Sequence, residues 1–366
     1  MPLAFGVAAL CSAAATPLAE RLSLRIGAVD RPDERKVSRR LNVPVLGGLA
    51  VSLGFFMGLA VPLLLLADAS SEPRLEALLL GGLLVLGVGA LDDRFGLAPI
   101  PKLVAQIGAA AVAIGFGFQI DHVTDPISRT VWHFPAWVAF GVTTGWIVIV
   151  TNSINLIDGL DGLCSGVSAI IAITLTWIAW QGGHLPGMVI GTALVGALLG
   201  FLPFNFPPAR IFLGDTGTLF VGYVLAILAL EGYQRVTVIT FIVPLFALAV
   251  PLLDTGLSIL RRIRSGKAIM QPDRQHIHHR LLSEYQGSQR SAVLSIYFLT
   301  ACFCVIAVSF TRLQGYAAIV FLAVIVLLTL RILRNLGLGQ VEENAGEGEV
   351  TPGAGSAGVR AKGGSR

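Results

Sequence analysis

The sequence is poor in charged residues. Asp, Glu, Lys and Arg make up 13% of its 366 residues, whereas a soluble globular domain has about 25%. Hydrophobic residues make up 54%. This composition excludes an ordinary soluble domain and predicts a chain that crosses a membrane several times.

Cysteine and net charge are also low. The four cysteines form no C-x-x-C pair, and all lie in or near apolar stretches, so we interpret them as small apolar side chains: Cys11, Cys164, Cys302 and Cys304. Neither a disulfide framework nor a zinc site is expected. The formal net charge of +4 resides in loops, and nucleic acid is not expected as a partner.

Long apolar runs dominate the chain instead. Eleven of them have spanning length, near residues 2–19, 46–67, 76–91, 102–120, 135–151, 163–180, 186–204, 215–230, 236–254, 291–311 and 315–334. We therefore expect an all-α, polytopic integral membrane bundle of about 11 transmembrane helices.

The distribution of basic residues predicts the orientation of this bundle. Alternate loops, together with the C-terminal segment, hold all the Lys and Arg except Arg74, Arg129, Arg235 and Arg312. The positive-inside rule places those loops in the cytoplasm, with the N-terminus outside and the C-terminus cytoplasmic. We expect residues 1–335 to form the membrane domain and the Gly-rich residues 336–366 to form a disordered cytoplasmic tail.

Five polar motifs fall in the loops predicted to be cytoplasmic. Their candidate residues are Arg35 and Lys36 in the first loop, Asp92, Asp93 and Lys102 in "LDDRFGLAPIPK", Asn152, Asn155, Asp158 and Asp161 in "TNSINLIDGLDGL", Asp215 in "GDTG", and Arg274, His276, His278 and His279 in "DRQHIHH". Because all five lie on one predicted face, we expect a single site at the cytoplasmic membrane surface.

Each motif also has a structural interpretation. The aspartates of the third and eighth spans are good helix caps, and the Gly-rich stretch from Thr151 to Leu163 could be a turn closed by Asx hydrogen bonds. Alternatively, Gly159 and Gly162 allow a ligand to approach the backbone. The basic loops could only fix topology or touch anionic lipid. The histidines could form a metal cluster, but adjacent His278 and His279 point apart, which favours anion or sugar binding.

Taken together, the motifs suit phosphoryl transfer at a membrane. Asp and Asn oxygens are ligands for Mg²⁺, with Mn²⁺ as the alternative, and Lys, Arg and His side chains bind phosphate. A cytoplasmic site at the bilayer can meet both a nucleotide and a lipid. In such a reaction a metal ion neutralises a diphosphate while basic side chains stabilise the developing charge.

Four motifs in order also carry a family resemblance. "LDDRFGL", "NSINLIDGLDGL", "RIFLGDTGTLFVG" and "DRQHIHHRLL" resemble those of the polyprenyl-phosphate N-acetylhexosamine-1-phosphate transferases, glycosyltransferase family 4. The resemblance extends over nearly the whole chain to about residue 335. "HIHHRLL", in place of a run of three histidines, resembles the WecA/TagO branch rather than the branch that uses UDP-MurNAc-pentapeptide.

The resemblance implies a reaction and a location. UDP-GlcNAc and undecaprenyl phosphate would give undecaprenyl-diphospho-GlcNAc and UMP, in a Mg²⁺-dependent first membrane step of cell-envelope glycan synthesis. The enzyme would be a multi-pass protein of the bacterial cytoplasmic membrane, in contact with membrane lipids, with its active site facing the cytoplasm. A homodimer is compatible with this family.

The resemblance also implies roles for individual residues. The implied catalytic residues are Asp92, Asp93 and Asp215, with Asp92 accepting or orienting the lipid phosphate. The implied metal ligands are Asn155, Asp215 and Asp93. Nucleotide binding is implied for Asp158, Asp161 and Asn152, and phosphate or sugar binding for Lys102, Arg274, His276, His278 and His279. Arg35 and Lys36 belong to a loop near the site, in which Ser38 replaces a histidine of many relatives.

Several alternatives remain at this stage. The donor could be another UDP-HexNAc. The protein could instead be a transporter or flippase for lipid-linked sugars, although transporters place polar groups near the bilayer midplane, or a scaffold that binds anionic lipid. Within the enzyme class, direct attack by the lipid phosphate is favoured over an acyl-phosphate formed on Asp92 or Asp93.

Overall fold

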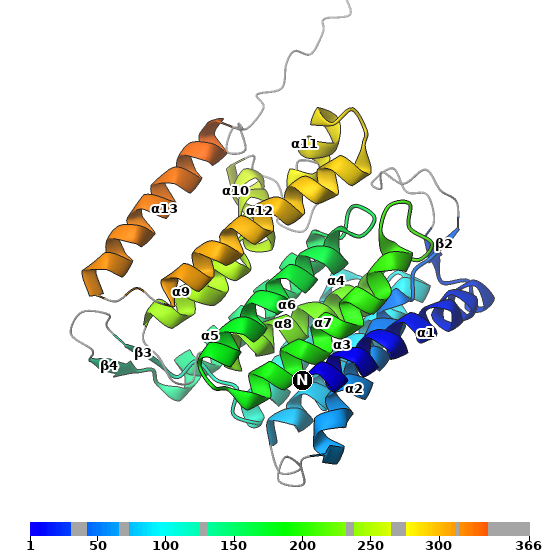
Figure 1. Ribbon diagram of the computed structural model, residues 1–366, viewed down its shortest axis with the longest axis horizontal. Helices are drawn as coiled ribbons and strands as arrows, with labels where there is room; N and C mark the ends of the chain where they lie inside the picture. The colour runs from blue at the N-terminus through cyan, green and yellow to red at the C-terminus, as the bar shows by residue number, and fades with distance from the viewer. Residues whose placement is uncertain are drawn as a thin grey trace, which may run out of the picture.

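The computed structural model describes residues 1–30, 42–65, 73–124, 130–231, 238–264, 276–311, 313 and 315–335. Within these ranges the chain forms thirteen helices and four short strands (Figure 1). The helices are α1 (Pro2–Ile26), α2 (Gly47–Leu65), α3 (Pro73–Phe95), α4 (Pro99–Gly115), α5 (Ala136–Leu156), α6 (Leu163–Gln181), α7 (Leu185–Asn205), α8 (Gly214–Glu231), α9 (Val238–Ala247), α10 (Ala249–Arg264), α11 (Ile277–Glu284), α12 (Gln289–Phe310) and α13 (Gly315–Asn335). The predicted tail, residues 336–366, lies outside the described residues.

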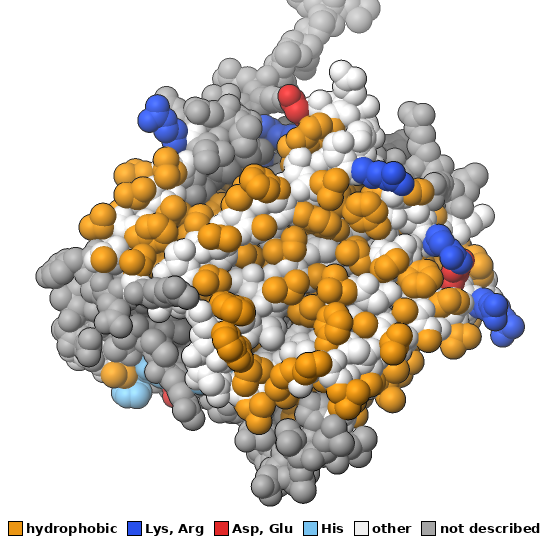
Figure 2. Space-filling view, in the orientation of Figure 1, with side chains coloured by type: hydrophobic (Ala, Val, Ile, Leu, Met, Phe, Trp, Pro, Cys, Tyr) orange, Lys and Arg blue, Asp and Glu red, His pale blue; other side chains and the backbone are white. Residues whose placement is uncertain are grey.

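The chain is a polytopic helical membrane protein. Seven of the described helices are long and apolar enough to cross a membrane: α1, α3, α5, α6, α7, α8 and α12. Figure 2 shows hydrophobic side chains spread over the sides of the bundle, while the Lys and Arg side chains in view lie near the C-terminal ends of α1 and α13 and beside α11. A surface that is apolar along the helices and charged near their ends is typical of a protein embedded in lipid.

Helix α8 is the centre of the bundle. All its residues from Thr216 to Glu231 are buried, as expected for a helix that is apolar on every side. It packs against α2, α3, α5, α6 and α7. Glycines allow close approach, because a Cβ on Gly48 would meet the backbone of Gly217 and one on Gly222 would meet Thr151. The first turn of α8, which carries Asp215, is therefore surrounded by the ends of its neighbours.

The run predicted as one ninth span is divided into two helices. Helix α9 ends at Ala247 and α10 begins at Ala249, so the prediction of one continuous helix over 236–254 is wrong. Proline explains the division: Pro251 has no N–H to donate to the carbonyl of Ala247, so the helical hydrogen bonding is interrupted there. The second half, α10, carries the buried Asp254.

Four short strands depart from the all-α expectation. β1 (Val29–Asp30) pairs antiparallel with β2 (Val43–Pro44), and β3 (His122–Thr124) pairs with β4 (Val131–His133). Strands of two or three residues are too short to show an alternating pattern in the sequence. The β1–β2 ladder matters for the site, because Phe212 donates its N–H to the carbonyl of Pro44 at 2.8 Å and accepts from Gly47 at 3.0 Å. These bonds hold the segment that leads into α8.

Candidate active site

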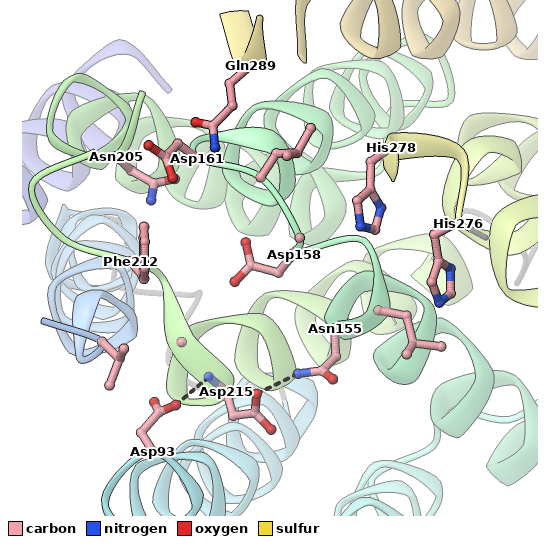
Figure 3. A pocket seen from close by; sticks show the side chains of 15 residues that line it. Asp93, Asn155, Asp158, Asp161, Asn205, Phe212, Asp215, His276, His278 and Gln289 are labelled. Atoms are coloured by element: carbon pink, nitrogen blue, oxygen red, sulfur yellow. Dashed lines mark hydrogen bonds between the residues drawn. The ribbon is translucent and has the colours of Figure 1, made fainter. Parts of the chain in front are cut away.

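A cavity of about 410 Å³ lies where α3 and α5 end and α8 begins. Figure 3 shows the side chains that surround it, and they come from segments far apart in the sequence. Residues of four of the five predicted motifs line it: Asp93, Asn155, Asp158, Asp161, Asp215, His276 and His278. Its volume falls within the range of about 300–1,000 Å³ typical of small-molecule sites. The described part of the chain therefore brings these motifs together.

Asp93 forms a cap for helix α8 from the end of α3. Its carboxylate accepts the N–H of Asp215 at 2.8 Å, and the N–H and hydroxyl of Thr216 at 2.9 and 2.5 Å. The first N–H groups of a helix have no partner within it, and a carboxylate there also favours the helix dipole. Gly214, with φ +69°, is required at this point because a Cβ would meet Asp93 and the carbonyl of Val45. The contacts of Asp93 thus fix the position of Asp215.

Lys102 joins two carboxylates. Its Nζ lies 3.0 Å from Asp92 Oδ2 and 2.9 Å from Asp215 Oδ2. Asp92 also accepts the N–H of Leu97 at 2.6 Å, at the turn between α3 and α4. Charge-assisted hydrogen bonds of this kind are about twice as strong as neutral ones. Asp92 and Lys102 therefore connect to the cavity through Asp215.

The stretch from Asn155 to Asp161 forms the side of the cavity at the end of α5. Asn155 donates to Asp215 Oδ1 at 3.0 Å and to Thr218 Oγ1 at 2.7 Å. Asp158 lies beyond the end of the helix, and Figure 3 shows it between the two histidines and the Asp93–Asp215–Asn155 group. Asp161 is buried and accepts the N–H of Ala209 at 2.9 Å. All three residues line the cavity, but the Asp161 carboxylate is held by the backbone of Ala209, whereas Asn155 bonds to Asp215.

Gly159 has a different consequence from the one expected. A Cβ there would overlap the ring of His278, so this glycine makes room for a protein side chain. His278 is buried, and its ring stacks on that of His276 with centroids 5.5 Å apart and planes 7° apart. The two rings form the opposite side of the cavity from Asp93.

The structure places the remaining predicted residues away from the cavity or outside the described residues. Asn152 donates to Gln106 Oε1 on α4 at 2.5 Å and to the carbonyl of Val148 at 2.8 Å, so it joins two helices and does not line the cavity. Arg35, Lys36 and Arg274 lie outside the described residues, as does the side chain of His279.

Several cavity residues were not predicted from the sequence, among them Asn205, Phe212 and Gln289. Asn205 ends α7 and bonds to Ser165 Oγ and the carbonyl of Ile211, and Gln289 begins α12. Phe212 supplies an apolar side chain. Asp254 is a further residue that was not predicted. It does not line the cavity itself, but it bonds to His276, which does. Its signal was present in the sequence, since a carboxylate within an apolar run is costly without a function.

The charges around the cavity favour a cation. Four carboxylates line it (Asp93, Asp158, Asp161 and Asp215), and its described lining includes no Lys or Arg. Within the described residues, no three His, Cys, Asp or Glu side chains form a ready-made metal site. The donor types nevertheless fit a hard cation, because carboxylate and amide oxygens are the ligands Mg²⁺ takes. An anionic substrate would be repelled here unless a cation accompanied it.

Comparison with known proteins identifies the family. The sequence pattern described as Glycosyl transferase family 4 matches residues 75–233, the segment that contains Asp92, Asn155 and Asp215. A Bacillus subtilis protein named probable undecaprenyl-phosphate N-acetylglucosaminyl 1-phosphate transferase is 38% identical over 84% of this chain and 84% of its own length. This chain belongs to glycosyl transferase family 4.

More distant relatives of the family extend the match. A Mycobacterium tuberculosis protein named decaprenyl-phosphate N-acetylglucosaminephosphotransferase is 34% identical over 79% of this chain and 77% of its own. An Escherichia coli protein named undecaprenyl-phosphate alpha-N-acetylglucosaminyl 1-phosphate transferase is 28% identical over 75% of each chain. These names confirm the WecA/TagO-like resemblance of this family member, and their acceptor lipids differ in length.

Proposed function

We propose that this protein transfers GlcNAc-1-phosphate from UDP-GlcNAc to a polyprenyl phosphate, giving polyprenyl-diphospho-GlcNAc and UMP. The observation that carries the proposal is the position of Asp215. It lies at the N-terminus of α8, bonds to Lys102 and Asn155, and shares a cavity with Asp158 and His276. The names of the relatives supply the transferred sugar phosphate and the lipid class.

The proposed step is a direct displacement. An oxygen of the lipid phosphate attacks the β-phosphorus of UDP-GlcNAc, the bond from that phosphorus to the bridging oxygen breaks, and UMP leaves with this oxygen. Phosphate monoesters have a second pKa of about 6, so the attacking oxygen needs little deprotonation at neutral pH. Lys102 and Asp92, bonded to each other, would orient the acceptor phosphate. Asp158 and the two histidines would face the donor.

A divalent cation is part of this proposal. Mg²⁺, or Mn²⁺ in its place, would be held by the oxygens of Asp215 and Asn155. When bound, it would neutralise the diphosphate and stabilise the charge that develops on it. Asp93 was a candidate ligand, but both its oxygens bond to the first turn of α8. Asp93 would therefore support the metal site by placing Asp215.

The arrangement in the membrane also remains a proposal. We infer about 11 spans, an outside N-terminus, and a site on the cytoplasmic face of a bacterial inner membrane. The excess of Lys and Arg in alternate loops supports this orientation. Residues 1–335 would form one membrane domain, and the domain could form a homodimer.

A transfer assay tests the function. Purified protein in detergent would receive UDP-[¹⁴C]GlcNAc, undecaprenyl phosphate and Mg²⁺. Labelled lipid is expected with the wild type and with Asp121→Asn, a carboxylate on the hairpin outside the site, but not with EDTA or with Asp215→Ala. Labelled product from Asp215→Ala would contradict the role of that residue.

The same assay separates the alternatives. Turnover of another UDP-HexNAc, without turnover of UDP-GlcNAc, would keep the transferase and change the donor. Failure of folded wild-type protein with every donor would favour the lipid-linked sugar transporter. In a separate experiment, positional isotope exchange of the phosphate oxygens of UDP-GlcNAc without lipid would favour a covalent acyl-phosphate over direct attack.

A further inference from the structure

A buried carboxylate–histidine pair lies beside the cavity. His276 Nδ1 is 2.9 Å from Asp254 Oδ2, and the two side chains are 7% and 3% exposed. A buried carboxyl group is costly unless it is paired and hydrogen-bonded. Each member of this pair therefore satisfies the other.

The pairing leaves one ring nitrogen of His276 for the cavity. A histidine with Nδ1 bonded to a carboxylate has its ring orientation and its proton position fixed by that bond. Because Nδ1 bonds to Asp254, Nε2 is the ring nitrogen that remains to bond a group in the cavity that His276 lines. The parallel ring of His278 lies against its face and limits rotation.

The fold brings the two residues together from separate helices. Asp254 lies on α10, which begins after the break at Leu248 and packs against α5 and α12. His276 is the residue directly before α11 and accepts the N–H of Arg280 with its carbonyl at 3.3 Å. Helix α5 carries Asn155. The break in the ninth apolar run thus places α10, with Asp254, against α5, the helix that carries Asn155.

We propose that Asp254 is a positioning residue for the transfer reaction. It holds His276 Nδ1 so that Nε2 is directed at the phosphate end of the nucleotide-sugar donor. The identity of that donor rests on the proposed function, whereas the positioning of the ring does not. Asp254 acts through His276 and does not itself touch the substrate.

A double-mutant cycle tests this coupling. Asp254→Asn keeps the shape of the side chain, removes its negative charge and replaces one carboxylate oxygen with an NH₂ group, which donates hydrogen bonds. We expect it to lower kcat about 10- to 100-fold, the range typical for loss of such a supporting partner, with a smaller change in KM. The double variant Asp254→Asn/His276→Gln should be no slower than His276→Gln alone. The control is Ser258→Ala, because Ser258 is also buried and lies one turn after Asp254 on α10. This variant should retain wild-type activity.

A histidine ¹⁵N spectrum gives a second measurement that does not depend on turnover. The His276 resonances are identified by their loss in His276→Gln, and we expect Asp254→Asn to shift them. Three results would overturn the proposal. The first is a wild-type kcat in Asp254→Asn, and the second is additive effects of the two substitutions on kcat in the double variant. The third is unshifted His276 resonances in Asp254→Asn. Failure of both Asp254→Asn and Asp254→Glu to fold, while His276→Gln folds, would also overturn it. An inactive wild type would overturn the proposed function, and the spectrum would still decide the role of Asp254.

Discussion

Removal of the Asp93 carboxylate should release the first turn of α8. In Asp93→Ala the N–H groups of Asp215 and Thr216 lose their acceptor, and so does the Thr216 hydroxyl. A hydrogen bond to a charged group contributes about 1.5–3 kcal/mol, and loss of a helix cap costs about 0.5–2 kcal/mol. Asp93 is partly exposed, so water replaces part of these bonds. We expect the free energy of unfolding to fall by about 2–4 kcal/mol.

Thermal unfolding in detergent measures this effect. For a chain of this length, a loss of this size corresponds to a fall in apparent Tm of about 3–6 °C. The variants are compared at one scan rate, because Tm depends on scan rate when unfolding is irreversible. Asp93→Asn keeps one carbonyl acceptor and should lose about half as much. The control is Glu20→Gln, which breaks an exposed ion pair with Arg210 worth about 0–1 kcal/mol.

The result also has a functional part. Because Asp93 places Asp215, Asp93→Ala should lose transfer activity even at temperatures at which it remains folded. An Asp93→Ala protein that melts together with Glu20→Gln and retains activity would refute both the cap and its role in the site.

Three further predictions concern neighbouring contacts. Lys102→Met removes the ammonium that competes for the carboxylates, so Mn²⁺ binding measured by electron paramagnetic resonance should tighten while lipid product falls; weaker binding would contradict this arrangement. Gly159→Ala adds a Cβ that displaces the His278 ring, so kcat should fall, and overpacking should cost about 1–3 kcal/mol; wild-type kcat would contradict the close contact. Asn152→Ala breaks the bond to Gln106, so Tm should fall with an unchanged KM for the donor; a raised KM would restore the nucleotide role implied by the family.

The sequence predicted the grouping of the motifs well. Asp92, Asn155 and Asp215 are separated by about sixty residues each along the chain, yet their loops fall on one predicted face because successive spans alternate in direction. The same alternation places the histidine loop beside them. The positions of the apolar runs and the bias of basic residues are sufficient to place these loops on one face, whatever the packing of the helices.

The sequence could not show which oxygens are already bonded. Asp158 and Asp161 are three residues apart in the same Gly-rich stretch and both line the cavity, but Asp161 accepts the N–H of Ala209, whereas Asp158 lies between the histidines and Asn155. The backbone leaves the α5 helix between Asn155 and Asp158, so helical periodicity no longer applies. Similarly, Asn152 faces α4 because α5 still is helical there. Such differences depend on tertiary neighbours that no local pattern encodes.

Some carboxylates hold the site in place and others are able to contact a ligand. The two kinds differ in how many of their oxygens already accept hydrogen bonds from the backbone. A carboxylate whose two oxygens both accept backbone N–H groups, as in Asp93, has little left for a ligand, whereas Asp215 bonds to a lysine and to a side-chain amide, partners that can rearrange around a cation. Adjacent residues Asp92 and Asp93 therefore take different roles although they look equivalent in the sequence. The acidic motif contributes one carboxylate to the ion-paired group and one to the helix that presents Asp215. Substituting either should therefore abolish transfer, but by different routes: Asp92 through the lost ion pair with Lys102, and Asp93 through the released first turn of α8.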